Sequence, residues 1–288
     1  MNTALHPPAW WSNNLLDEGF VEHQARTLQA SPLPYDLAAW LVPHFDAQAL
    51  SQSNEAQLED SLIAPLLRQM GWFPVPQRVF SIQGKTARPD WSLALDEARQ
   101  SALLCEHDPQ AAASQLAAIC EAKAWDRPLD TGRASLDNPH HQLQDYLASL
   151  RVRFGMLTNG RQWRLYDTLE ITARKTFLQI DLEAVMALPE GAERHKALAL
   201  FAFFFGRNTY VPPTTDAPAS LLEQTLADAR THALAVEENL KAVIYGFAGE
   251  DSLFENLGKA LPEAQKKLPA PRRPSLEAIY ENALIWLF

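Results

Sequence analysis

Apolar and polar positions follow two spacings along the chain, and these predict a region of mixed helices and strands. Apolar residues three and four positions apart predict helices over residues 54–70 and 139–150. Short runs that alternate in polarity, or that are apolar throughout, predict strands instead. The predicted strands cover residues 77–82, 91–95, 103–105, 117–122, 154–158, 162–167 and 175–180.

Two features of this pattern predict how the strands are arranged. Residues 117–122 are mostly apolar on both faces, which is typical of a strand in the middle of a sheet. Asn159-Gly160 separates the strands 154–158 and 162–167, and this dipeptide is typical of a type I′ turn in a hairpin. The predicted fold class is therefore α/β, with a mixed central sheet flanked by helices over residues 51–182.

The flanking segments carry no strand pattern and predict helices. Residues 1–50 are expected to form an N-terminal helical arm, and residues 183–288 a helical connector. The chain ends in apolar residues without a polar tail, so we expect it to be cut from a longer protein. The helices predicted in these flanks cover residues 17–28, 35–45, 198–205, 220–247 and 275–288.

Length and composition are those of an ordinary globular protein. The chain has 288 residues, of which 47% are hydrophobic, without an apolar run of the length that spans a bilayer. Its first residues lack the basic and apolar regions of a signal peptide, so we expect a cytoplasmic protein without membrane contact. The net charge of −10 argues against a protein that coats DNA. It is compatible with an enzyme that meets DNA through an acidic, metal-binding pocket.

The candidate chemistry lies where the central strand ends, at Glu121-Ala122-Lys123. Alternate residues of a strand share a face, so Glu121 and Lys123 are expected side by side. Asp90, after Pro89, opens the strand 91–95. Two carboxylates suffice to bind Mg²⁺, and an adjacent lysine can orient or deprotonate a water and stabilise charge on a phosphate. The pattern predicts a site for phosphodiester hydrolysis.

A third acid is expected from the helix at 54–70, which carries Glu55 and Glu59 on one side. An acid in the first turn of a helix favours the helix dipole, and this explains Glu55 without a functional role. Glu59 lies deeper, beside the apolar stripe. We therefore choose Glu59 as the helix acid, with Glu55 as the alternative.

These residues resemble the PD-(D/E)xK nuclease superfamily, within it the N-terminal nuclease domain of Type I restriction subunits and of Type IIG-like restriction–modification enzymes. The resemblance covers residues 54–180, with a longer segment than usual between Asp90 and Glu121. The motifs that carry it are Asn54-Glu55-Ala56, Leu66-Leu67, Gly71-Trp72, Arg88-Pro89-Asp90, Glu121-Ala122-Lys123-Ala124, Gln142-x-x-x-Tyr146 and Leu157-Thr158-Asn159-Gly160-Arg161-x-Trp163-x-Leu165-Tyr166-Asp167.

The resemblance implies a Mg²⁺-dependent DNA endonuclease domain of a restriction or phage-defence system, in which Mn²⁺ can replace Mg²⁺. It implies Asp90 and Glu121 as metal ligands, together with the carbonyl of Ala122, and Lys123 as the catalytic lysine. Glu59 completes this set as the helix acid.

Gln142 and Tyr146 resemble the Gln-x-x-x-Tyr motif of RecB-type nucleases, in which the pair supports the lysine or contacts DNA. The implied partners are double-stranded DNA and the methyltransferase and target-recognition domains of the whole protein. Two other functions stay open on the sequence. One is a catalytically inactive DNA-binding or scaffold domain, and the other is a RecB-like exonuclease that works beside a helicase.

Overall fold

The computed structural model describes residues 8–16, 18–29, 33–130, 138–170, 176–214, 219–245 and 256. Contacts divide the chain into two units, Met1–Asp228 and Ala229–Phe288, and the boundary falls within one helix. The first unit contains the sheet and the candidate site. Of the second unit the structure describes the rest of that helix and Asn256, so the helix predicted at 275–288 lies outside the described residues.

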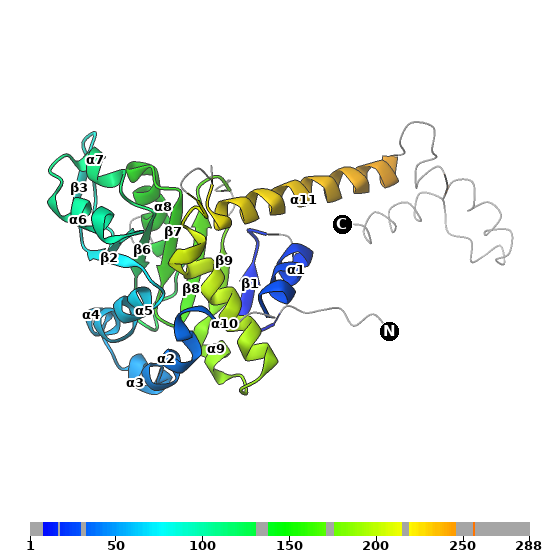
Figure 1. Ribbon diagram of the computed structural model, residues 1–288, viewed down its shortest axis with the longest axis horizontal. Coiled ribbons are helices and arrows are strands. Elements are labelled where there is room, and N and C mark those ends of the chain that lie inside the picture. The colour runs from blue at the N-terminus through cyan, green and yellow to red at the C-terminus, as the bar shows by residue number, and fades with distance from the viewer. Residues whose placement is uncertain are drawn as a thin grey trace, which may run out of the picture. The chain divides into compact units, whose positions relative to one another are not determined.

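The first unit is built on a seven-stranded mixed sheet in the order β1-β9-β8-β7-β6-β5-β2 (Figure 1). Neighbouring strands are antiparallel except β6 and β7, which are parallel. A separate hairpin pairs β3 with β4. The strands are β1 Trp11–Asn13, β2 Phe73–Pro76, β3 Phe80–Ile82, β4 Lys85–Ala87, β5 Trp91–Ala94, β6 Ala118–Ala122, β7 Phe154–Thr158, β8 Gln162–Asp167 and β9 Leu178–Asp181.

Helices surround this sheet and precede and follow it in the chain. Short 3₁₀ segments lie at Pro34–Asp36 and Arg207–Thr209, and Glu59–Ile63 forms a π-helical turn. The α-helices are α1 Glu18–Gln29, α2 Leu37–His44, α3 Ala47–Ser51, α4 Glu55–Leu58, α5 Ala64–Gln69, α6 Glu97–Cys105, α7 Pro109–Ala113, α8 Pro139–Leu150, α9 Leu182–Ala187, α10 Ala192–Phe205 and α11 Leu221–Tyr245.

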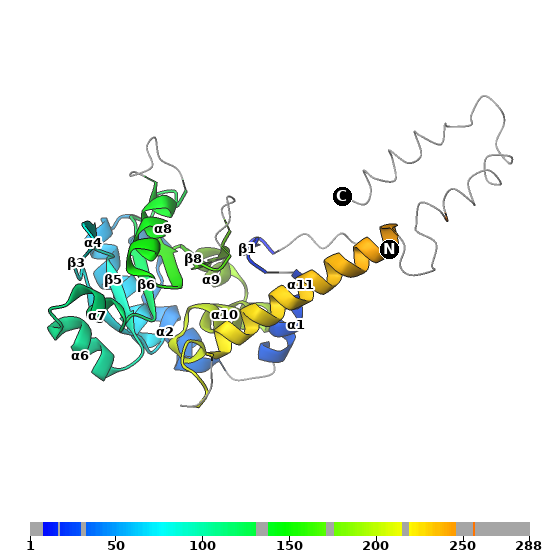
Figure 2. The ribbon, with the colours of Figure 1, turned by 90° about the horizontal axis from the view of Figure 1, so that it is seen from above.

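The two faces of the sheet belong to two separate apolar clusters. On one face α10 packs Phe201 and Phe205 edge-on against Trp163 of β8, with ring centroids 5.5 and 5.8 Å apart. On the other face Leu143 and Leu147 of α8 pack over β6 and β7. Figure 2 shows α8 and α10 on opposite sides of the strands. The α/β fold class, a mixed sheet flanked by helices with helices in the C-terminal region, is confirmed.

The predicted helix at 54–70 is one continuous helical run with a π-helical turn inside it. Asn54 and Gln57 form a capping box, which satisfies two backbone N–H groups at its start. The N–H of Ala64 bonds to the carbonyl of Glu59, five residues back, just before Pro65. Because proline has no N–H to donate, the backbone around Pro65 cannot keep the regular α-helical bonding, and the helix is irregular here.

Gly71 follows the end of this helical run and terminates it. Its φ is +82°, its N–H bonds to the carbonyl of Arg68, and the N–H of Trp72 bonds to that of Leu67. This is a Schellman motif, which needs a left-handed residue after the helix.

Replacing Gly71 by alanine is expected to lower the free energy of unfolding by about 1–3 kcal/mol, because alanine is strained at this φ. Its methyl group would also lie 3.2 Å from Cε1 of Tyr35. Gly84→Ala is the matched control, because Gly84 has a φ of +77° and no atom near its would-be Cβ. Urea unfolding should show a larger loss for Gly71→Ala than for Gly84→Ala. Equal losses would assign the whole effect to the backbone.

Three local predictions were wrong. Residues 103–105 belong to α6 rather than to a strand, because Asp96 caps that helix by accepting the N–H of Arg99 at 2.8 Å. The β7–β8 connection is not a two-residue type I′ turn, since Thr158 pairs with Trp163 and only Gly160 of this loop has a positive φ. Residues 77–82 form a strand only from Phe80.

The two edge strands of the large sheet were not predicted, and neither was β4 of the separate hairpin. β1 pairs Trp11 with Ile180 of β9, although its segment was expected to be helical. β2 carries Pro74 and Pro76 and pairs with β5. Prolines are tolerated in an edge strand, where one side of the backbone has no partner strand.

The helices after the sheet agree with the sequence pattern. α10 begins six residues before the predicted start at 198, and α11 covers most of the predicted 220–247. None of the helices in the described residues is both long enough and apolar enough to span a bilayer. In the second unit, the α11 side chains of Leu234 and Val236 are exposed.

Candidate active site

Three of the predicted site residues lie together at one end of β5 and β6. Asp90 directly precedes β5, Glu121 lies near the end of β6, and Lys123 directly follows β6. β5 and β6 are antiparallel neighbours with Trp91 opposite Cys120, so Asp90 and Glu121 are adjacent. The N–H of Lys123 bonds to the carbonyl of Thr158 at 2.8 Å, which fixes its backbone to the neighbouring strand β7.

Direct contacts connect the three side chains. The N–H of Ala122 donates to Oδ2 of Asp90 at 2.8 Å, and this bond orients the aspartate. Nζ of Lys123 lies 2.8 Å from Oε1 of Glu121 and 3.9 Å from Oδ2 of Asp90. The N–H of Asp90 lies 3.4 Å from Oε2 of Glu121, a long hydrogen bond. The lysine therefore lies between two carboxylates held by the strand backbone.

Burial and mutual repulsion make this an unfavourable place for negative charge. Glu121 is 1% exposed, and burial followed by the charge of Asp90 raises its pKa to about 7, although Lys123 lowers it in part. Burial lowers the pKa of Lys123, but the charge and hydrogen bond of Glu121 raise it by more, so the net shift is upward. The lysine carries its charge at neutral pH in the protein alone.

The helix acids lie on the same side of the site but differ in their contacts. Burial, then the charges of Asp90 and Glu55, raise the pKa of Glu59 to about 7. Glu55 is exposed, and its Oε2 accepts the N–H of Ala124 at 3.0 Å. Glu59 thus shares the electrostatic environment of the predicted site, while Glu55 holds the backbone just after Lys123. The sequence offered no signal for the hydrogen bond between Ala124 and Glu55, because the two residues are 69 positions apart in the chain.

The raised pKa of Glu121 predicts that the protein loses stability as pH rises. The folded state binds a proton that the unfolded state releases between pH 4.5 and about 7, so ionisation disfavours folding across this window. We therefore compare the free energy of unfolding of Glu121→Gln with that of wild type at each pH. This difference should favour the variant by about 1–3 kcal/mol more at pH 8 than at pH 5. Thermal unfolding at both pH values, without divalent ions, measures this.

The matched control for this prediction is Glu193→Gln, which removes an exposed glutamate from the first turn of α10. Its stability difference from wild type should change little between the two pH values. A Glu121→Gln difference that is equally independent of pH would contradict the electrostatic account of the site.

Gln142 and Tyr146 bond to each other on α8, with Nε2 of Gln142 donating to the tyrosine oxygen at 3.2 Å. Both are half-buried, and Tyr146 packs against the apolar cluster under α8. Within the described residues, no direct hydrogen bond connects this pair to Asp90, Glu121 or Lys123. Their predicted role beside the lysine stays a prediction.

The donor set fits a hard divalent cation. Asp90 and Glu121 supply two carboxylates, the number through which Mg²⁺ is usually held while it keeps several waters. Burial, followed by repulsion from Asp90, raises the pKa of Glu121, and a bound cation would offset both effects by stabilising the ionised carboxylate. Within the described part of the chain, no group of three or more His, Cys, Asp or Glu side chains is arranged to hold a metal ion.

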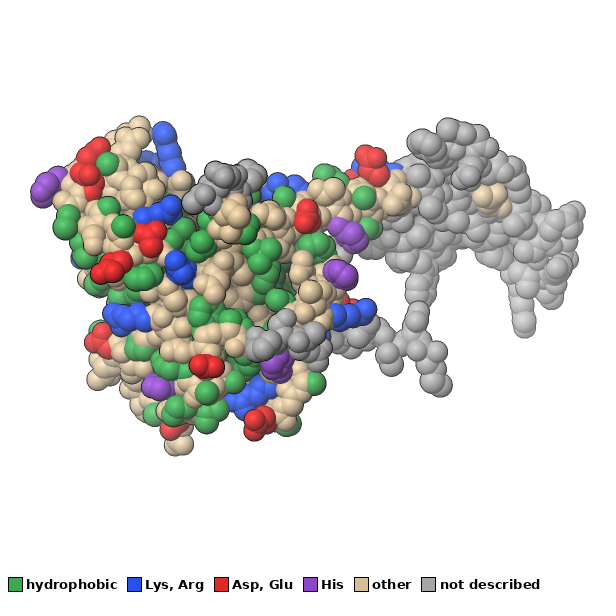
Figure 3. All heavy atoms as spheres, in the orientation of Figure 1, with side chains coloured by type: hydrophobic (Ala, Val, Ile, Leu, Met, Phe, Trp, Pro, Cys, Tyr) green, Lys and Arg blue, Asp and Glu red, His purple; other side chains and the backbone are tan. Residues whose placement is uncertain are grey.

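The face of the molecule seen in Figure 3 carries no concentration of one sign of charge among its described residues. In the view of Figure 3, acidic and basic side chains of the described residues are interspersed rather than gathered by sign. The chain as a whole carries a net charge of −10.

Comparison with known proteins gives little beyond this geometry. No family model and no curated protein matches the chain. One solved structure with similarity is the cryo-EM structure of a DrdV–DNA complex, with a TM-score of 0.32 and 16% sequence identity. The alignment covers 89% of this chain and 20% of that one, so this chain spans about a fifth of that protein's length. A TM-score of this size does not establish a shared fold.

Proposed function

We propose that the chain is a Mg²⁺-dependent DNA endonuclease domain with a PD-(D/E)xK core. The observation that carries the proposal is the position of Lys123, with Nζ at 2.8 Å from Glu121 and 3.9 Å from Asp90 at one strand end. Acid–base surface pairs are common, but they are usually exposed and loosely held. Here Glu121 is buried and Asp90 is oriented by a backbone N–H.

Each residue has a separate task in this proposal. Asp90 and Glu121 would hold the ion, which when bound supplies an acidified water and neutralises phosphate charge. Lys123 donates a hydrogen bond to the attacking water or to a phosphate oxygen, where negative charge develops. Glu121 holds the lysine in place, and Glu59 adds a further carboxyl group to the same site.

Double-stranded DNA is the proposed substrate, with methyltransferase and target-recognition domains as partners in the whole protein. The solved DrdV structure is a complex with DNA, but its similarity to this chain is too low to carry the argument. The acidic net charge is the main objection. It is consistent with a domain that cuts DNA while other parts of a longer protein supply most of the affinity.

The proposal is tested by cleavage and metal binding in parallel. The full 288-residue chain is incubated with supercoiled plasmid and Mg²⁺, Mn²⁺ or EDTA, and Mn²⁺ binding is titrated by calorimetry. We expect nicking with either ion, none with EDTA, and loss of both nicking and Mn²⁺ binding in Asp90→Asn. Asp90→Asn, purified in the same way, also controls for contaminating nucleases.

The outcomes separate the candidate functions. DNA binding without metal binding or cleavage would favour the scaffold domain over the nuclease. Cleavage of linear DNA but not of closed circles would favour an exonuclease. If the Asp90→Asn variant nicked the plasmid as fast as the wild-type protein, the assignment of the site would be contradicted.

A further inference from the structure

A cavity lies at the opposite end of the sheet from the acidic site. It has a volume of about 470 Å³ and is bordered by Leu95 after β5, Ala117 before β6 and Phe154 at the start of β7. Ala117 lies four residues before Glu121, which is roughly 13 Å along an extended strand. The cavity is therefore separate from the acidic site, and none of its lining residues belongs to that site.

The walls of this cavity are of two kinds. Leu116, Val152 and Tyr210 contribute apolar surface, and Tyr210 is held by a hydrogen bond from its hydroxyl to the carbonyl of Phe204. Gln110 and Ser149 contribute amide and hydroxyl groups. Cavities of roughly 300–1,000 Å³ with apolar walls and a few polar groups are typical of small-molecule sites.

Three arginines and one acidic residue, Glu223, are among the described residues that line the cavity, and Glu223 is paired with Arg153, which leaves Arg99 and Arg151 to meet an anion. Arg153 is fixed, because it bonds to Asp167 and Glu223 and lies over the ring of Phe154. In the described part of the chain, the side chain of Arg99 pairs only with that of Asp96, at 3.5 Å, and both are exposed to solvent. Arg151 has an exposed side chain and, among the described residues, no hydrogen-bond or ion-pair partner.

The backbone also sets the position of Arg151. It follows α8 in the left-handed conformation, with φ of 55° and its N–H bonded to the carbonyl of Leu147. A non-glycine residue in this conformation costs about 1 kcal/mol or more. Scattered surface arginines are usually only solvated. Two arginines with few or no partners, at a cavity whose third arginine is fixed, fit an anion better.

We propose that this cavity binds a nucleotide, with its phosphates at Arg99 and Arg151 and its base against the apolar wall. Guanidinium groups bind phosphate oxygens through paired hydrogen bonds, which a lysine cannot match. A flat ring fits the surface of Leu116, Val152 and Tyr210, and Gln110 and Ser149 can bond to polar atoms of the base or sugar. The inference does not depend on cleavage activity at the acidic site.

Calorimetric titration of the full chain with ATP, AMP and pyrophosphate tests the proposal, with EDTA present so that no divalent ion occupies the acidic site. ATP should bind more tightly than AMP, and pyrophosphate should bind at least tenfold more weakly than ATP. The double replacement Arg99→Gln/Arg151→Asn should weaken ATP binding at least tenfold. Asparagine is chosen at 151 because it tolerates the left-handed conformation.

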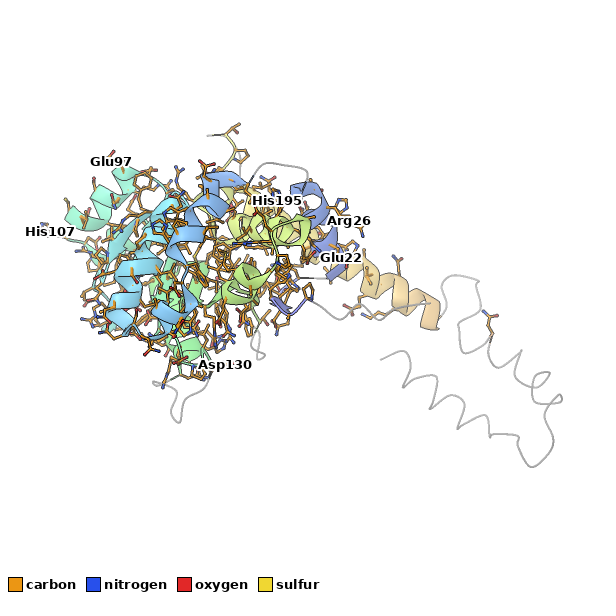
Figure 4. The ribbon with its side chains drawn as sticks, turned by 90° about the horizontal axis from the view of Figure 1, so that it is seen from below. Glu22, Arg26, Glu97, His107, Asp130 and His195 are labelled. Carbon is orange, nitrogen blue, oxygen red and sulfur yellow. The ribbon has the colours of Figure 1, made fainter. Side chains whose placement is uncertain are left out.

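Two controls make the result specific. Arg26→Gln removes another exposed arginine, which pairs with Glu22 on α1 (Figure 4), and should leave ATP binding unchanged. Asp90→Asn should also leave it unchanged, because Asp90 lies at the other end of the sheet. No ATP binding at millimolar concentration, or binding that Asp90→Asn abolishes, would overturn the proposal. Pyrophosphate binding as tight as that of ATP would overturn the nucleotide assignment.

Discussion

Replacing Lys123 by alanine is expected to reduce the rate of DNA cleavage by about 10²–10³-fold or more, the usual cost of losing one group that stabilises developing charge. Its ammonium group is the only cation within 4 Å of both Asp90 and Glu121 in the described residues. The loss should appear in the single-turnover rate at saturating DNA and Mg²⁺, since the two proposed metal ligands remain.

Lys123→Arg tests whether a positive charge alone is sufficient at this position. Arginine keeps the positive charge beside Glu121, but its larger guanidinium does not give up a proton and donates in a different geometry. We expect cleavage to fall by about tenfold or more while folding, seen by circular dichroism, is kept. Lys241→Ala is the matched control, because Lys241 forms an exposed pair with Glu237 at 2.5 Å. This variant should cleave DNA at the wild-type rate. Wild-type rates in Lys123→Ala would remove the lysine from the mechanism.

The second large effect is on stability and concerns Arg153, far from the acidic site. Asp167 is fully buried and accepts hydrogen bonds from Nε and Nη2 of Arg153, both at 2.9 Å. Arg153→Ala leaves this carboxylate buried with only the N–H of Leu169 as a remaining partner among the described contacts. We expect the free energy of unfolding to fall by about 3–5 kcal/mol, as is usual when one partner of a buried pair is removed.

A double replacement distinguishes the loss of a partner from the loss of the pair. Arg153→Met/Asp167→Leu removes both charges and should recover much of the stability lost in Arg153→Ala, because no buried charge is left unpaired. Arg26→Ala, at an exposed pair, should cost about 0–1 kcal/mol in the same urea titration. A loss in Arg153→Ala no larger than that of Arg26→Ala would contradict this account.

The central part of the fold follows from local sequence patterns. β6 was predicted within one residue because its side chains are apolar on both faces, and α8 was predicted to the residue because Pro139 and the apolar spacing mark its length. The adjacency of Asp90 and Glu121 follows from two neighbouring buried strands that end together. These features depend on residues near one another in the chain.

The missed features depend on distant partners. β1 is three residues long and becomes a strand only because β9, almost 170 residues later, pairs with it. The sequence around Leu103 and Cys105 fits a strand as well as a helix. These residues are helical because the helix that contains them begins at the cap residue Asp96. At the site, the hydrogen bond from the N–H of Ala124 to Glu55 likewise joins two elements whose approach no local pattern encodes.

The short strand β1 also bears on how the protein behaves when its N-terminus is lost. β1 and β2 are the two edges of the large sheet, and β2 is protected from further pairing by Pro74 and Pro76. β9 has no proline and carries the buried Leu178 and Ile180. Proteolysis before Asn14 would uncover it, and an open strand of this kind pairs readily with another molecule. Trimming the first residues is therefore expected to cause aggregation while the acidic site stays intact.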